Sequence, residues 1–111
     1  SAFSGCTSLT SVTISNSLAY IEQGMFSGCT SLTNVAIGSG VTSFGTSVFA
    51  YCSSLASVTI SYGVTGIGTS AFYGCTKLAS VTIPGSVLNI GTSAFNGCSS
   101  LTGAEYAEVI T

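Results

Sequence analysis

The sequence contains no histidine, no aspartate and no tryptophan, and only one of its 111 residues is a cation. Histidine and aspartate complete Ser-His-Asp and Cys-His sites, so nucleophilic catalysis of these kinds is excluded. A single lysine, Lys77, excludes the positive surface of a nucleic-acid binder and a polybasic attachment to anionic lipid. We therefore expect a protein that is not an enzyme, needs no cofactor and does not bind nucleic acid.

Long apolar runs and charge are scarce as well. The longest apolar run, residues 48–52, is far below the roughly 20 residues of a membrane span, so no transmembrane segment is predicted. Charged residues make up 4% of the chain, whereas a soluble surface normally carries roughly 25 to 35%. Two of them, Glu105 and Glu108, are interpreted as solvated rather than as a catalytic pair. A surface of Ser, Thr, Asn and Gly is expected to self-associate or to carry O-linked sugar.

A 23-residue repeat fills the chain, and residues 70–92 show it most clearly. The units are 1–23, 24–46, 47–69, 70–92 and a partial 93–111, which we interpret as one domain. Two columns recur without a gap: Phe3, Phe26, Phe49, Phe72 and Phe95, and Cys6, Cys29, Cys52, Cys75 and Cys98. Leucine, valine and isoleucine columns follow them in the same phase.

Within a unit, residues 9–14 alternate apolar and polar side chains and predict a short strand with Val12 and Ile14 inward. Residues 18–21 predict a second, shorter strand, and residues 1–6 a compact turn or a single helical turn. About seven buried apolar side chains supply ~10 to 20 kcal/mol per unit, less than the ordering cost of ~1.5 kcal/mol for each residue. One unit cannot fold alone, so we predict a repeat solenoid of about five stacked rungs with parallel β-sheets.

The cysteines occupy one slot of the repeat, between an interior Phe and an interior Leu. We interpret them as buried thiols that act as small apolar fillers. A disulfide between adjacent rungs is the alternative. A metal site is not expected, because the chain has neither His nor a C-x-x-C pair.

The outward strand positions are the candidate interaction or glycan-bearing face. They are Ser11, Thr13, Asn34, Ser57, Thr59, Ser80 and Thr82, in two files with rungs ~4.8 Å apart. Such a face could bind an ordered surface such as ice or polysaccharide, or it could accept O-linked glycan. The remaining alternative is a solvated sheet face without a ligand.

The five tyrosines are scattered over the repeat. Tyr20, Tyr51, Tyr62, Tyr73 and Tyr106 do not share one column of the repeat, so no stacking platform for sugars or bases is expected. In the third unit Tyr51 replaces the Gly that precedes Cys elsewhere. We take this to mean that the position does not demand a positive φ.

The pattern AFxGCxxLxxVxIPxxVxxIG, read in residues 71–91, resembles the BspA-like class of leucine-rich repeats over nearly the whole chain. The resemblance implies a right-handed solenoid with one main parallel sheet, a short second strand and a small helical turn in each unit. It also implies an extracellular or cell-surface location and roles in adhesion and in binding host or matrix proteins.

Two functional hypotheses follow. The first is a structural protein whose copies stack head to tail into a fibre or surface scaffold, because bare apolar ends and unpaired strand edges are templates for another copy. The second is a fragment of a cell-surface adhesin that recognises protein or glycan through its sheet face. Ice binding is a weaker third option. The chain starts in mid-pattern at Ser1 without a Met, so we expect a processed product or a piece of a longer array.

Overall fold

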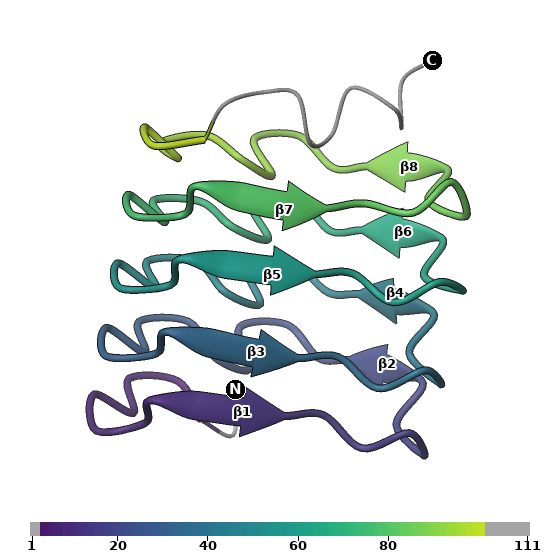
Figure 1. Ribbon diagram of the computed structural model, residues 1–111, viewed down its shortest axis with the longest axis horizontal. Helices are drawn as coiled ribbons and strands as arrows, with labels where there is room; N and C mark the ends of the chain where they lie inside the picture. Colours follow the sequence, from purple (N-terminus) through teal and green to yellow (C-terminus); the bar gives the residue numbers. More distant parts are fainter. Residues whose placement is uncertain (1–2, 102–111) are drawn as a thin grey trace.

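The structure, a computed structural model, describes residues 3–101. Its eight short strands alternate between two parallel sheets, so that the chain winds as a coil (Figure 1). The first sheet holds β1 (Ser11–Thr13), β3 (Asn34–Ala36), β5 (Ser57–Thr59) and β7 (Ser80–Thr82). The second holds β2 (Tyr20–Ile21), β4 (Ser43–Phe44), β6 (Gly66–Ile67) and β8 (Asn89–Ile90).

The first sheet is built from three-residue strands with a valine at each centre. Each valine pairs with the valine of the next strand, in the order Val12, Val35, Val58 and Val81. A β-branched side chain fits the pleated, half-buried surface of a sheet. Successive side chains point to opposite faces, so the valines point inward and the residues on either side point outward.

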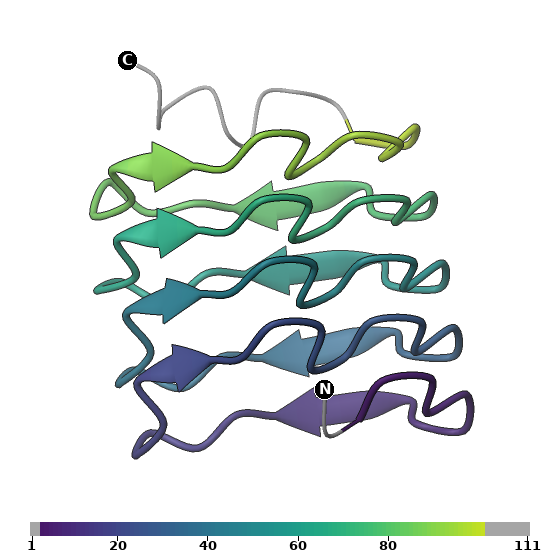
Figure 2. The same cartoon turned by 180° about the vertical axis from the view of Figure 1, so that it is seen from behind.

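The second sheet lies behind the first in Figure 1 and in front of it in Figure 2, and each of its strands has two residues. Ile21, Phe44 and Ile67 are its buried residues. In Figure 1 the chain runs rightward along the front sheet, returns leftward along the rear one and rises with each turn. The coil is therefore right-handed, as parallel crossovers nearly always are. The predicted right-handed parallel β-solenoid is confirmed.

The single helical turn expected in each unit is not seen within residues 3–101. In the third unit the amides of Ser47, Phe49 and Tyr51 donate to carbonyls of the next turn, at 2.9, 2.8 and 2.6 Å. Ala50, between two of these residues, instead donates to the Ser47 carbonyl over 3.2 Å. Every second amide is thus committed to the neighbouring turn, which leaves no run of local bonds from which a helix could form.

The core fills the space between the two sheets as columns of like residues. Phe49, Leu55 and Val64 have no solvent-exposed surface, and their equivalents in the fourth unit are buried as well. No buried polar or charged residue occurs within residues 3–101. Three residues discussed in the sequence analysis lie outside the described residues: Glu105, Tyr106 and Glu108.

Candidate functional site

The outward side chains of the first sheet form two straight files on one face. Strand pairing aligns Ser11, Asn34, Ser57 and Ser80 in one file, and Thr13, Ala36, Thr59 and Thr82 in the other. All are exposed except Ser80, which is half-buried. None of them is charged. Asn34 and Ala36 interrupt the two files in the same row, so the hydroxyl pattern is not continuous.

The hydroxyls of this face are free to meet a partner. Within residues 3–101, no side chain of the two files makes a hydrogen bond to the protein. Threonines at the corners behave differently, because Thr33, Thr42 and Thr65 donate their hydroxyls to carbonyls of the preceding turn at 3.1, 3.1 and 3.2 Å. The sheet face thus presents donors and acceptors that the fold itself does not use.

The phenylalanine column is a continuous stack of rings. Neighbouring rings lie 5.4 Å apart between centroids and within 11° of parallel, from Phe3 to Phe95. Phe44 of β4 adds edge contacts to Phe49 and Phe72 at 6.0 and 6.2 Å. Phe49 and Phe72 in this column are interior packing with no exposed surface, whereas Phe3 at the first described turn is partly exposed.

All five cysteines are free thiols. Cys52 and Cys75 have no exposed surface, and each donates its thiol to the carbonyl of a Phe in the preceding turn, at 3.2 and 3.1 Å. Desolvation by burial raises the pKa of Cys52 to about 12 and also raises that of Cys75. A thiol held protonated in this way is neither a nucleophile nor a metal ligand at neutral pH.

The backbone at Tyr51 corrects one expectation. Its φ is +62°, close to the +75° of Gly28 and the +74° of Gly74 at the same position of neighbouring units. The position therefore demands a positive φ even where the residue is tyrosine. For a bulky side chain this conformation is a genuine outlier. The amides of this turn are hydrogen-bonded to carbonyls of the next turn, and these bonds fix the backbone conformation. Tyr51 therefore adopts the same positive φ as the glycines.

Two tyrosines from different columns of the repeat nevertheless meet. The rings of Tyr51 and Tyr73 lie 5.6 Å apart between centroids at 70°, in an edge-to-face contact. Together with Ser47, Ala50 and Ser70 they line a shallow groove of about 150 Å³. The signal in the sequence was the Tyr at a Gly position, followed 22 residues later by a second Tyr.

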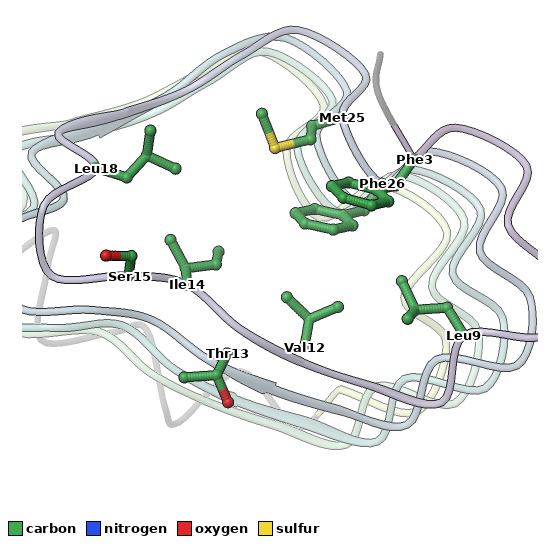
Figure 3. Close-up of a pocket in the computed structure, with 9 residues that line it drawn as sticks. All are labelled: Phe3, Leu9, Val12, Thr13, Ile14, Ser15, Leu18, Met25 and Phe26. Atoms are coloured by element: carbon green, nitrogen blue, oxygen red, sulfur yellow. The ribbon is translucent and has the colours of Figure 1, made fainter.

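A larger apolar recess opens at the first described turn (Figure 3). It has a volume of about 300 Å³, and Val12, Ile14 and Leu18 point into it. Phe3 is 45% exposed here, whereas Phe49 and Phe72, its equivalents two and three turns on, are fully covered. The recess is the surface on which another turn packs everywhere else in the solenoid.

Neither a metal centre nor a membrane helix is found in the described part of the chain. No group of three or more His, Cys, Asp or Glu side chains is placed to hold a metal ion among residues 3–101. Across the same residues, no helix combines the length and the apolar character that crossing a membrane requires.

Comparison with known proteins gives one family. The model of the BspA type leucine rich repeat region (6 copies) matches residues 1–102. No protein of curated function matches the sequence.

Solved structures of leucine-rich repeat proteins are similar to the chain. A leucine-rich repeat protein from Bacteroides ovatus is 36% identical over 88% of this chain and 25% of its own, with a TM-score of 0.85. A leucine rich cell surface protein from Faecalibacterium prausnitzii is 40% identical over 91% of this chain and 27% of its own, with a TM-score of 0.88. The T. pallidum leucine-rich repeat protein is 25% identical over 98% of this chain and 72% of its own, with a TM-score of 0.57.

The chain spans about a quarter of the length of the first two of these proteins. The family model, the repeat and the two parallel sheets agree over nearly all of the sequence. The chain therefore belongs to the BspA-type leucine-rich repeat family.

Proposed function

We propose that this chain is part of an extracellular, non-enzymatic surface scaffold that recognises a neutral partner, a glycan or a matrix protein, through the face of β1, β3, β5 and β7. The observation that carries the proposal is the pair of outward files, whose hydroxyl and amide groups are not hydrogen-bonded to the protein within residues 3–101. Family membership and the similarity to a cell surface protein support the location.

The chemistry of the face defines the kind of partner. It offers hydroxyl donors and acceptors in three of its four rows, an amide in the other, and no charge, which suits a polar, uncharged surface such as a polysaccharide. Each contact is weak, but the side chains are short and stand on a rigid sheet, so little conformational entropy is lost on binding. The same hydroxyls are where we expect any O-linked sugar, which the intact mass of the protein from its natural source would reveal.

The test removes hydroxyls without disturbing the strands. In the variant Thr13→Val, Thr59→Val and Thr82→Val, each side chain stays β-branched and exposed but loses its donor and acceptor. Binding would be measured on a glycan array and on immobilised matrix proteins. We expect a loss of at least tenfold in affinity with an unchanged melting temperature.

The matched control is Thr65→Val, since that hydroxyl bonds to the Thr42 carbonyl at 3.2 Å and does not belong to the files. The control should lower the melting temperature and leave binding intact. The proposal fails if the wild-type protein binds no glycan or matrix protein, or if the triple variant binds as well as the wild type.

Head-to-tail assembly into a fibre is a second candidate function. Each turn pairs with the next in one constant register, so any exposed turn is complementary to another turn of the same repeat. Such a contact joins unlike surfaces and continues indefinitely. We propose that copies of this chain stack on one another through such a contact.

Sedimentation of the 111-residue protein over a range of concentrations tests the assembly. We expect the wild type to form long species and Leu18→Glu, which places a charge in the recess, to remain monomeric. Leu88→Glu is the control, because Leu88 is 77% exposed and does not line the recess. A wild type that stays monomeric at high concentration would eliminate fibre formation.

A further inference from the structure

The groove between Tyr51 and Tyr73 is a second candidate for recognition. It lies in the turns that connect β4 to β5 and β6 to β7, so it does not include the outward files of the first sheet. We propose that it is a binding subsite for one ring of a neutral sugar. The proposal does not depend on the function proposed for the sheet face.

The backbone that carries the groove is hydrogen-bonded from turn to turn. The amide of Tyr51 donates to the carbonyl of Tyr73 at 2.6 Å, and those of Ser47 and Ser70 donate to the turns that follow them at 2.9 and 3.0 Å. The ring of Tyr51 lies over Gly74, where a Cβ would come within 3.0 Å of its Cδ1 atom. The Tyr51 ring therefore lies close to the backbone of the next turn on one side, while the residue as a whole is 57% exposed.

Its chemistry combines aromatic surface with unused hydroxyls. Two rings at 70° form a corner against which the C–H face of a pyranose can pack, since the face of an aromatic ring is electron-rich. The hydroxyls of Ser47 and Ser70 have no hydrogen-bond partner within residues 3–101 and are available to a sugar hydroxyl. The residues that line the groove carry no charge, which favours a neutral ligand.

The size of the groove points to a single ring. About 150 Å³ is well below the roughly 300 to 1,000 Å³ of a site for a drug-sized ligand. A shallow groove at the edge of the solenoid can hold one residue of a longer chain while the rest of the chain continues outside. We therefore expect weak affinity for a monosaccharide and higher affinity for an oligosaccharide.

The fold does not require either ring. At the position of Tyr51 the other four units carry glycine, which adopts a positive φ without strain. At the position of Tyr73 the other units carry Ser4, Ser27, Ala50 and Asn96. A strained tyrosine that the fold would accept as glycine is more simply explained by a use for its ring.

The experiment exploits this difference. Because the chain has no tryptophan, its tyrosine fluorescence reports on the five tyrosines directly. Titration with methyl glycosides of glucose, galactose, mannose and N-acetylglucosamine, and with their short oligosaccharides, should change the emission of the wild type saturably. Tyr51→Gly should lower the affinity at least tenfold while keeping the melting temperature as high as that of the wild type or higher. NMR of sugar protons gives the same affinities independently of the remaining tyrosines.

Two controls separate this site from other surfaces. Tyr62→Ser removes a tyrosine that is 79% exposed and does not line the groove, so sugar affinity should not change. The variant Thr13→Val, Thr59→Val and Thr82→Val alters only the sheet face, and sugar binding by the groove should survive it. The triple variant therefore distinguishes a failure of the groove proposal from a failure of the function proposed for the sheet face.

Three outcomes would overturn the inference. The first is that none of these sugars perturbs the protein. The second is that Tyr51→Gly binds as tightly as the wild type. The third is that a proline-rich peptide, which aromatic grooves also accept, occupies the groove and the sugars do not.

Discussion

Replacing Phe49 with alanine removes the middle ring of the phenylalanine stack, and its cost can be compared with that of Phe3→Ala at the first described turn. Phe49 has no exposed surface and stacks at 5.4 Å on Phe26 and on Phe72. Phe3 is 45% exposed and is stacked on Phe26 alone among the described rings. The two variants delete the same atoms from the same position of the repeat, so their difference measures what a second neighbouring turn contributes.

The structure sets the expected magnitudes. A closed site that cannot collapse costs about 3 to 5 kcal/mol on Phe→Ala. Phe49 belongs in the upper half of that range, because hydrogen-bonded turns on both sides resist collapse. At Phe3 the substitution removes about half of the burial free energy of a phenylalanine, ~1 to 1.5 kcal/mol. It leaves no closed cavity. We therefore expect the free energy of unfolding to fall by ~3 kcal/mol more for Phe49→Ala than for Phe3→Ala.

Urea denaturation followed by circular dichroism measures both values. The slope of the free energy against urea should stay constant if each variant unfolds as one unit, and a lower slope in Phe49→Ala would show that the array has split at its centre. Equal destabilisation by the two substitutions would refute the reasoning, since stability would then not depend on contacts between adjacent turns.

Three further predictions concern glycines and thiols. Gly68→Ala should destabilise the protein by ~1 to 3 kcal/mol, because the new Cβ would lie 2.6 Å from the Gly45 carbonyl carbon. Gly66→Ala is the control in the same urea assay. It should be neutral or slightly stabilising, because a Cβ at Gly66 meets open space. At pH 8 an alkylating reagent should label Cys52 and Cys75 only after unfolding, and mass spectrometry that finds them modified in the folded protein would contradict their burial. In the folded state burial raises the pKa of both thiols above the ordinary 9.0, so between pH 9 and about 12 the unfolded state binds fewer protons and the stability falls as pH rises. Each thiol contributes up to ~1.4 kcal/mol per pH unit to this fall. In the double variant Cys52→Ala and Cys75→Ala, the free energy of unfolding should therefore fall less steeply above pH 9. An unchanged fall would contradict its attribution to these two thiols.

Much of the fold follows from the spacing of the repeat. Like residues recur every 23 positions, so stacking the units in phase places valine on valine and phenylalanine on phenylalanine. The alternation within residues 9–14 then decides which side chains point inward and which form the outward files. These inferences need only the period of a strand and the rule that one unit is too small to bury its own apolar residues.

The groove was beyond this reasoning because it combines two different columns of the repeat. Tyr51 and Tyr73 meet across adjacent turns only because the turn backbone places the first ring over Gly74. The positive φ of Tyr51 was likewise hidden, since the sequence shows which residue occupies a position but not the dihedral angles that the position imposes. The bond from each buried thiol to a phenylalanine carbonyl spans 26 residues and depends on the same stacking.

The amino-acid sequence alone therefore determined the solenoid, its period, its interior and its outward files, because all of these depend on regular spacing. Only the tertiary structure decided the shape of the turns, the chemical state of the thiols and the pairing of the two tyrosines. These features depend on how the amides of one turn bond to the next, and that geometry exists only when the turns are stacked.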